Sequence, residues 1–210
     1  MDQTSSVPLS ELEPSQALPK VLERGFFFIR HGESTANALQ VISGSVDVDL
    51  TAKGRAQAYA AADIMAGRDI SAVFASPQRR AFDTAVPSAD RLGQDIRVLD
   101  GLREQHWGPL EGQPWAARQS LLEPPEGGEP HRLFRQRVWS ALLAIDGALQ
   151  EIPSTAPVLI VAHSGVYRLL LSLLSIPPIR EKVPNGVPML FTPPEDGVWD
   201  GAPWTVTSVA

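Results

Sequence analysis

The sequence predicts an α/β fold, a three-layer α/β/α sandwich with a largely parallel central sheet. Short apolar runs, typical of strands buried on both faces, alternate along the chain with longer segments whose apolar residues recur at helical spacing. The chain has 210 residues, of which 43% are hydrophobic, so it is long enough for one domain with a sizeable core. The sequence contains no internal repeat and no low-complexity tract.

Five apolar runs predict the strands. They are residues 25–29, 70–75, 96–99, 158–162 and 189–191, of which the run at 96–99 is the weakest. Because strands that alternate with helices form βαβ units, we expect most of these strands to run parallel.

Four segments between these runs predict helices: residues 51–65, 78–86, 130–149 and 165–174. Thr51 suits the N-cap of the first helix, and Pro130 suits the first turn of the third. Residues 101–130 are different, because they combine tryptophans with prolines and glycines. We expect them to form a long irregular excursion, of the kind that often covers a site.

Residues 1–24 form a polar lead with three prolines, and we interpret them as an N-terminal extension outside the core. The domain is expected to span residues 25–210. The first 24 residues lack the pattern of a signal peptide, and the most apolar window, residues 158–176, carries Arg168 in its middle. We therefore expect a soluble, cytoplasmic protein without membrane contact.

Composition excludes several classes of function. The chain has no cysteine, so a thiol nucleophile, a disulfide and a zinc–thiolate site are all ruled out. Its net charge is −6, whereas a nucleic-acid binder normally has a basic surface, so no nucleic-acid partner is expected. His106 and His131 have no partner at metal-ligand spacing.

Three of the apolar runs end in cationic or imidazole side chains. Arg30 and His31 follow the first run, Arg80 follows the second, and His163 follows the fourth. The carboxyl ends of parallel strands meet at one edge of a sheet, where open α/β folds bind ligands. Arginine can fork onto two phosphate oxygens, and a neutral imidazole can attack phosphorus. The sequence therefore predicts a phosphate site at this edge.

The ordered motifs resemble the histidine phosphatase superfamily, also called the phosphoglycerate mutase-like family. The matching residues are Arg30-His31-Gly32-Glu33 with Asn37; Asp49-Leu50-Thr51 with Gly54 and Gln57-Ala58; Ser76-Pro77 with Arg80-Ala81 and Thr84-Ala85; Leu102-Arg103-Glu104 with Gly108 and Glu111-Gly112; Gly128-Glu129 with Arg137-Val138; and Ala162-His163-Ser164-Gly165. The resemblance implies an α/β sandwich and a two-step phosphoryl transfer through a phosphohistidine, with neither metal nor cofactor.

The resemblance also implies roles for individual residues. His31 is the expected nucleophile, and Arg30, Arg80 and His163 are expected to neutralise the phosphoryl oxygens. Glu104 is expected to give a proton to the leaving oxygen and then to activate water. The expected function is hydrolysis of a small phosphate monoester.

Four further residues are expected to contact phosphate or substrate: Asn37, the backbone near Ser43 and Gly44, and the hydroxyl of Ser164. Ser164 departs from the family, which commonly has glycine there, and Ala36 stands where the mutases usually carry tryptophan. The stretch between Glu104 and His163 is also shorter than the insertion typical of mutases. The last two features favour a phosphatase over a mutase.

Other interpretations are weaker. Asp47, Asp49 and Thr51 match the D-x-D-x-T motif of the magnesium-dependent haloacid dehalogenase phosphatases, but Ser43-Gly44-Ser45 stands where that motif needs a buried strand. Ser164 in a serine-hydrolase elbow is disfavoured because Val166 is too large for that turn. A phosphoglycerate mutase-type transferase, and a non-catalytic domain that binds phosphate ligands or a partner, remain the alternatives.

Overall fold

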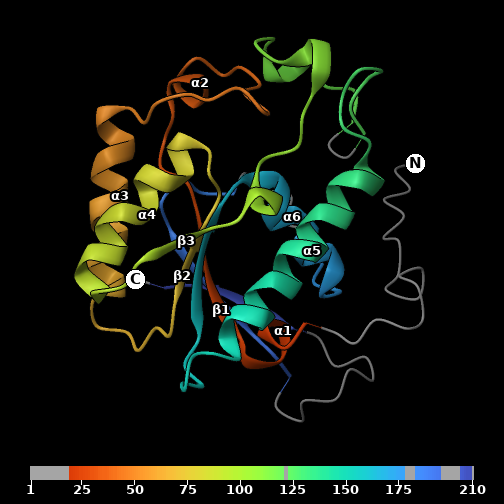
Figure 1. The fold of residues 1–210 in the computed structure, drawn as a ribbon. Coiled ribbons are helices and arrows are strands. Elements are labelled where there is room, and N and C mark those ends of the chain that lie inside the picture. The colour runs from red at the N-terminus through yellow and green to blue at the C-terminus, as the bar shows by residue number, and fades with distance from the viewer. Residues whose placement is uncertain (1–18, 121–122, 178–182, 195–203, 210) are drawn as a thin grey trace.

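The computed structural model describes residues 19–120, 123–177, 183–194 and 204–209. A six-stranded sheet in the order β3-β2-β4-β1-β5-β6 forms its centre (Figure 1). Its strands are β1 (Phe26–Arg30), β2 (Val73–Ala75), β3 (Ile96–Val98), β4 (Val158–Ala162), β5 (Pro188–Thr192) and β6 (Thr205–Ser208). The expected α/β fold with a largely parallel sheet is confirmed, since β3, β2, β4 and β1 pair in parallel.

The other edge of the sheet departs from the expected parallel pattern. β5 pairs antiparallel with β1, and β6 pairs antiparallel with β5. The strand β6 has no counterpart among the predicted apolar runs, because it is an edge strand with exposed or half-buried side chains. Such a strand alternates polar and apolar residues weakly, so the sequence gives little signal for it.

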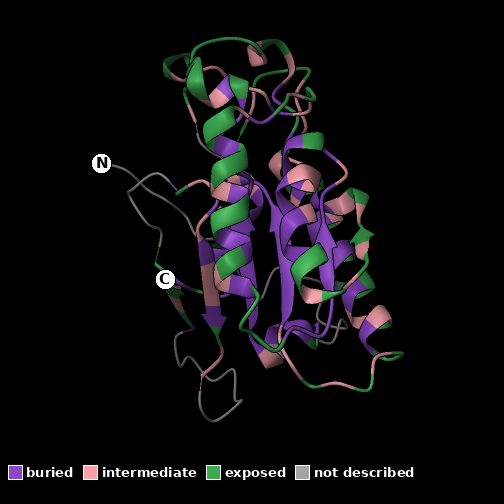
Figure 2. Cartoon of the chain, turned by 90° about the vertical axis from the view of Figure 1, so that its left-hand side faces the viewer, coloured by how far each residue is buried: buried purple, intermediate pink, exposed green. Residues whose placement is uncertain are grey.

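Helices cover both faces of the sheet (Figures 1 and 2). Helices α3 (Ala52–Met65) and α4 (Arg79–Leu92) cover one face, and α1 (Val21–Arg24), α5 (His131–Leu149) and α6 (Ser164–Leu173) cover the other. α2 (Thr35–Ala38) is a single turn that follows β1. In the described part of the chain, no helix is long and apolar enough to cross a membrane.

The helix α4 is longer than the predicted segment 78–86. It continues through Pro87, which is buried, and ends where Gly93 adopts a left-handed conformation with φ of 62°. The Gly93 N–H bonds back to the carbonyls of Ala89 and Asp90, which is a common way to terminate a helix. A proline removes one helical hydrogen bond. Burial of this helix face against α3 and the sheet stabilises the helix despite that loss, so the helix continues beyond Pro87.

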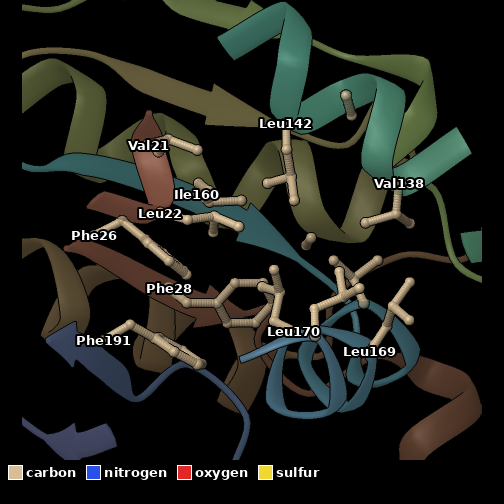
Figure 3. Close-up of a cluster of buried hydrophobic side chains, with 14 of the residues drawn as sticks. Val21, Leu22, Phe26, Phe28, Val138, Leu142, Ile160, Leu169, Leu170 and Phe191 are labelled. Atoms are coloured by element: carbon tan, nitrogen blue, oxygen red, sulfur yellow. The ribbon is translucent and has the colours of Figure 1, made fainter. Parts of the chain in front are cut away.

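Side-chain alternation along β1 divides the core into two clusters. Phe26 and Phe28 point to the face covered by α1, α5 and α6, whereas Phe27 and Ile29 belong to the cluster under α3 and α4. Figure 3 shows the first cluster, in which Phe26 stacks on Phe191 with ring centroids 4.7 Å apart. Because successive strand residues face opposite sides, a run of apolar residues is what a strand between two helix layers requires.

The residues just before β1 pack into this core rather than lying outside it. Val21 and Leu22 on α1 are buried, and Leu22 is 0% exposed. The backbone N–H groups of Lys20 and Val21 donate to the carboxylate of Asp146 on α5, which caps the short helix. Interpreting all of residues 1–24 as outside the core was therefore wrong for Val21 and Leu22, while residues 1–18 lie outside the described residues.

We predict that Leu22→Ala lowers the free energy of unfolding by about 2–5 kcal/mol, because it leaves a cavity in a fully packed cluster. Urea denaturation measures this change. Leu39→Ala is the control, since Leu39 is 73% exposed and its truncation should change stability by less than about 0.5 kcal/mol. Equal stability of the two variants would show that α1 contributes nothing to the core.

Candidate active site

The strands β1, β2 and β4 are adjacent and parallel, so their carboxyl ends meet at one edge of the sheet. A pocket of about 200 Å³ lies there. Its lining comprises Arg30, His31, Asn37, Val41, Ser43, Gly44, Arg80, Glu104, Trp115, Arg118, Ser164 and Arg168. Eight of the nine predicted site residues are in this lining, and the ninth, His163, lies next to His31 with ring centroids 5.3 Å apart.

His31 is held by its own loop in one orientation. Its backbone N–H donates to the carbonyl of Ala162 at 3.0 Å, which continues the pairing of β1 with β4. Its ring Nδ1 lies 2.7 Å from the carbonyl oxygen of Gly32. A carbonyl can only accept, so Nδ1 carries the proton and Nε2 keeps a free lone pair. This tautomer leaves Nε2 available as a nucleophile.

Both histidines of the site are neutral at physiological pH. Burial lowers the pKa of His31 well below its usual value of 6.5, and the neighbouring Arg30 and Arg80 lower it further. Burial likewise lowers the pKa of His163, with Arg80 as the next cause. The Nε2 of His163 lies 2.8 Å from the hydroxyl of Ser76. The two rings therefore add no positive charge to the pocket.

The two predicted arginines are buried and anchored by backbone carbonyls. Arg30 donates to the carbonyl of Val183 at 2.6 Å, and Arg80 donates to those of Gly44 and Val46 at 2.9 Å each. Burial lowers the pKa of Arg30 to about 10, so it stays protonated at neutral pH. The Nε atoms of both arginines and Nδ1 of His163 are buried without a hydrogen-bond partner among the described residues. Buried donors of this kind are ready to bind an anion.

Glu104 enters the pocket from the start of the excursion. Its Oε2 accepts hydrogen bonds from the Ser164 hydroxyl at 3.2 Å and the Gly165 N–H at 3.0 Å. The backbone on either side is also fixed, because Arg137 donates to the Glu104 carbonyl at 3.0 Å and forms an ion pair with Glu129 at 2.7 Å. Arg137 therefore holds the segment that carries Glu104.

Two residues that the sequence analysis did not single out connect the site loops. The Gln78 side chain accepts from the Glu104 N–H at 2.7 Å and donates to the Gly44 carbonyl at 3.0 Å. Asn185 donates to the His31 carbonyl at 2.7 Å and to Asn37 Oδ1 at 3.1 Å. Both act across long sequence separations, so no local pattern marks them.

The excursion reaches over the pocket, as expected. Trp115 lines the pocket, and its indole N–H donates to the Val41 carbonyl at 2.9 Å. Figure 1 shows the green turns of the excursion at the same end of the sheet as α2, at the top of the view. Arg118, which follows, also lines the pocket and lies over the ring of Trp107 at 4.3 Å from its centroid. The excursion therefore supplies part of the wall.

The aspartates of the D-x-D-x-T motif lie outside the pocket lining. Asp47 accepts from the backbone N–H of Arg79, and Asp49 forms an ion pair with the Arg79 side chain at 3.0 Å. Thr51 caps α3, as the sequence indicated. Within the described ranges, no group of three or more His, Asp or Glu residues could hold a metal ion.

The buried neutral histidines predict a loss of stability in acid. The unfolded chain binds protons at His31 and His163 as the pH falls through about 6.5, whereas the folded chain does not. The free energy of unfolding should therefore fall by about 1.4 kcal/mol per histidine between pH 7.5 and 5.5. Urea denaturation in phosphate-free buffer measures this slope. His31→Asn should reduce this slope, and an unchanged slope in that variant would contradict the prediction.

Comparison with known proteins agrees with this geometry. Residues 26–183 match the histidine phosphatase superfamily (branch 1). The chain is 33% identical over 180 residues to a glucosyl-3-phosphoglycerate phosphatase of Mycolicibacterium vanbaalenii, covering 73% of this chain and 76% of the relative. It is also 43% identical over 89 residues to a 2,3-bisphosphoglycerate-dependent phosphoglycerate mutase of Mycobacterium bovis, covering 40% of this chain and 36% of the mutase.

A solved structure of a similar phosphatase matches most of the chain. The fold superposes on a mycobacterial glucosyl-3-phosphoglycerate phosphatase in complex with VO3 with a TM-score of 0.74 and 28% sequence identity. The superposition covers 87% of this chain and 97% of that structure. Since the family match extends from β1 to the pocket residue Arg168 and beyond, through residue 183, the chain belongs to the histidine phosphatase superfamily.

Proposed function

We propose that the protein hydrolyses small phosphate monoesters through a phosphohistidine on His31, without a metal ion. The observation that carries this proposal is the free Nε2 of a neutral, buried His31 beside Arg30 and Arg80, whose Nε atoms have no partner among the described residues. A nucleophile and two fixed cations are what phosphoryl transfer needs, because catalysis there is mostly positioning and charge stabilisation.

In the first step, Nε2 of His31 attacks phosphorus. The P–N bond forms as the bond to the leaving oxygen breaks, and the electron pair of that bond goes to the leaving oxygen. Glu104, in its acid form, gives its proton to this oxygen, so the product leaves as an alcohol. Arg30 and Arg80 stabilise the charge on the equatorial oxygens, and His163 donates a hydrogen bond beside them.

In the second step, water replaces the imidazole. Glu104, now a carboxylate, takes a proton from the water as its oxygen bonds to phosphorus. The P–N bond breaks, its electron pair returns to Nε2, and inorganic phosphate leaves. The hydrogen bonds that Glu104 accepts from Ser164 and Gly165 stabilise this carboxylate form.

Water as the acceptor, rather than a second substrate, is supported by the relatives that span most of the chain. These are named phosphatases, whereas the mutase matches over only 40% of the chain. We also propose that the protein is cytoplasmic and that it has no nucleic-acid partner. The absence of a nucleic-acid partner agrees with the net charge of −6.

We predict that rapid quenching with ³²P-labelled substrate in excess EDTA traps an acid-labile, base-stable adduct. His31→Ala should lack the adduct and turn over no substrate, because no other imidazole replaces Nε2. His106→Ala is the control and should retain both, since His106 does not line the pocket. An adduct that persists in His31→Ala would assign the nucleophile to another residue, and loss of turnover in EDTA would contradict the metal-free mechanism.

We predict that Glu104→Gln slows phosphorylation by glycerol 3-phosphate by about 10²–10⁴-fold, because an alkoxide leaving group needs a proton. The loss with p-nitrophenyl phosphate should be much smaller, since its leaving group departs without one. Single-turnover kinetics separates this step from hydrolysis, and the exposed Glu151→Gln is the control. Equal losses with both esters would leave Glu104 a structural carboxylate.

A further inference from the structure

The pocket holds more positive charge than a phosphoryl group requires. Four arginines line it, Arg30, Arg80, Arg118 and Arg168, against the single carboxylate of Glu104. The chain as a whole is acidic, with 18 Lys and Arg residues against 24 Asp and Glu, so this concentration of arginine is local. Two guanidinium groups, Arg30 and Arg80, are already assigned to the phosphoryl oxygens. Arg118 and Arg168 have no assigned role in the transfer of the phosphoryl group.

Among the described residues, Arg118 and Arg168 form neither an ion pair nor a side-chain hydrogen bond, and Nε of Arg118 is buried without a hydrogen-bond partner. Three other arginines, in contrast, form ion pairs: Arg79 with Asp49, Arg91 with Asp63, and Arg137 with Glu129. A cation that is partly desolvated and unpaired is unfavourable until an anion binds it.

The surrounding structure holds both side chains at the pocket. The guanidinium carbon of Arg118 lies 4.3 Å from the ring centroid of the buried Trp107, and this cation–π contact helps to hold the side chain at the pocket wall. Arg168 lies four residues after Ser164 on α6, so both side chains face the pocket from one side of that helix. Burial lowers the pKa of Arg118, the Glu104 carboxylate raises it, and the positive charge of Arg168, which lines the same pocket, lowers it. An anion between them would relieve this repulsion.

We propose that Arg118 and Arg168 form a second anion subsite, which selects phosphate monoesters that carry a further anionic group, a carboxylate or a second phosphate. The proposal rests on the proposed phosphatase function and adds its substrate class. In this arrangement Arg30 and Arg80 bind the phosphoryl group to be transferred, and Arg118 and Arg168 bind the other anion of the same molecule. Arg118 and Arg168 thus act as specificity residues.

Two matched substrate pairs test the subsite and its preferred anion. 3-Phosphoglycerate differs from glycerol 3-phosphate by a carboxylate in place of a hydroxymethyl group, and fructose 1,6-bisphosphate differs from fructose 6-phosphate by a second phosphate. The wild type should prefer the more anionic member of at least one pair in kcat/KM. Arg118→Gln and Arg168→Gln should each reduce that preference by about 10- to 100-fold, as expected for a lost charge-assisted hydrogen bond.

Arg97→Gln is the control, because it removes the same charge from an exposed position on the edge strand β3 and should leave the preference unchanged. The pair that shows the arginine-dependent preference identifies the anion. No preference in the wild type, or an equal loss on both members of each pair in the variants, would overturn the subsite.

Binding to the inactive His31→Ala variant separates this proposal from the proposed function. Calorimetry should show that 3-phosphoglycerate or fructose 1,6-bisphosphate binds more tightly than its less anionic partner, and that Arg118→Gln in the same background abolishes the difference. If the wild type hydrolyses none of the four esters but this binding difference is found, the phosphatase function fails and the subsite stands. If the wild type hydrolyses these esters but no such difference in binding is found, the phosphatase function stands and the subsite fails.

Discussion

The parallel pairing of β1 with β4 is the constraint on which the site depends. Its register places Arg30 opposite Ala162, so the chain leaves both strands at the same level and His31 comes next to His163. The hydrogen bond from the His31 N–H to the Ala162 carbonyl extends this pairing by one residue. A slip of one residue would turn every side chain of β1 to the opposite face and separate the two rings.

Burial of charge at this edge requires compensation, and the loops provide it. Arg30 and Arg80 are nearly inaccessible, yet each donates to backbone carbonyls, while the two histidines avoid the cost of a buried charge by staying neutral. Some donors remain without a partner among the described residues. These unpaired buried donors lower the stability of the fold locally, and an anionic ligand that accepts their hydrogen bonds removes this cost. Such a cost is common where a structure is organised for binding rather than for stability.

The position of Glu104 illustrates how a site loop becomes fixed without regular structure. Its backbone is held by Gln78, the N-cap residue of α4, and by Arg137 from α5, and its carboxylate is held by the first turn of α6. These contacts come from elements that lie on different faces of the sheet and far apart in sequence. The excursion is therefore irregular but anchored, and it can present both Glu104 and Arg118 to one pocket.

The layered fold and the motif residues that follow the central strands are predictable from the sequence, because burial on both faces and helical periodicity are local properties of the chain. The antiparallel direction of β5 and β6, the docking of Val21 and Leu22, and the links that Gln78 and Asn185 form between loops are visible in the three-dimensional structure alone. The tertiary structure also brings Arg118 and Arg168 to one pocket. Each of these depends on contacts between residues distant in sequence, whose geometry is set by strand pairing and packing rather than by any local pattern.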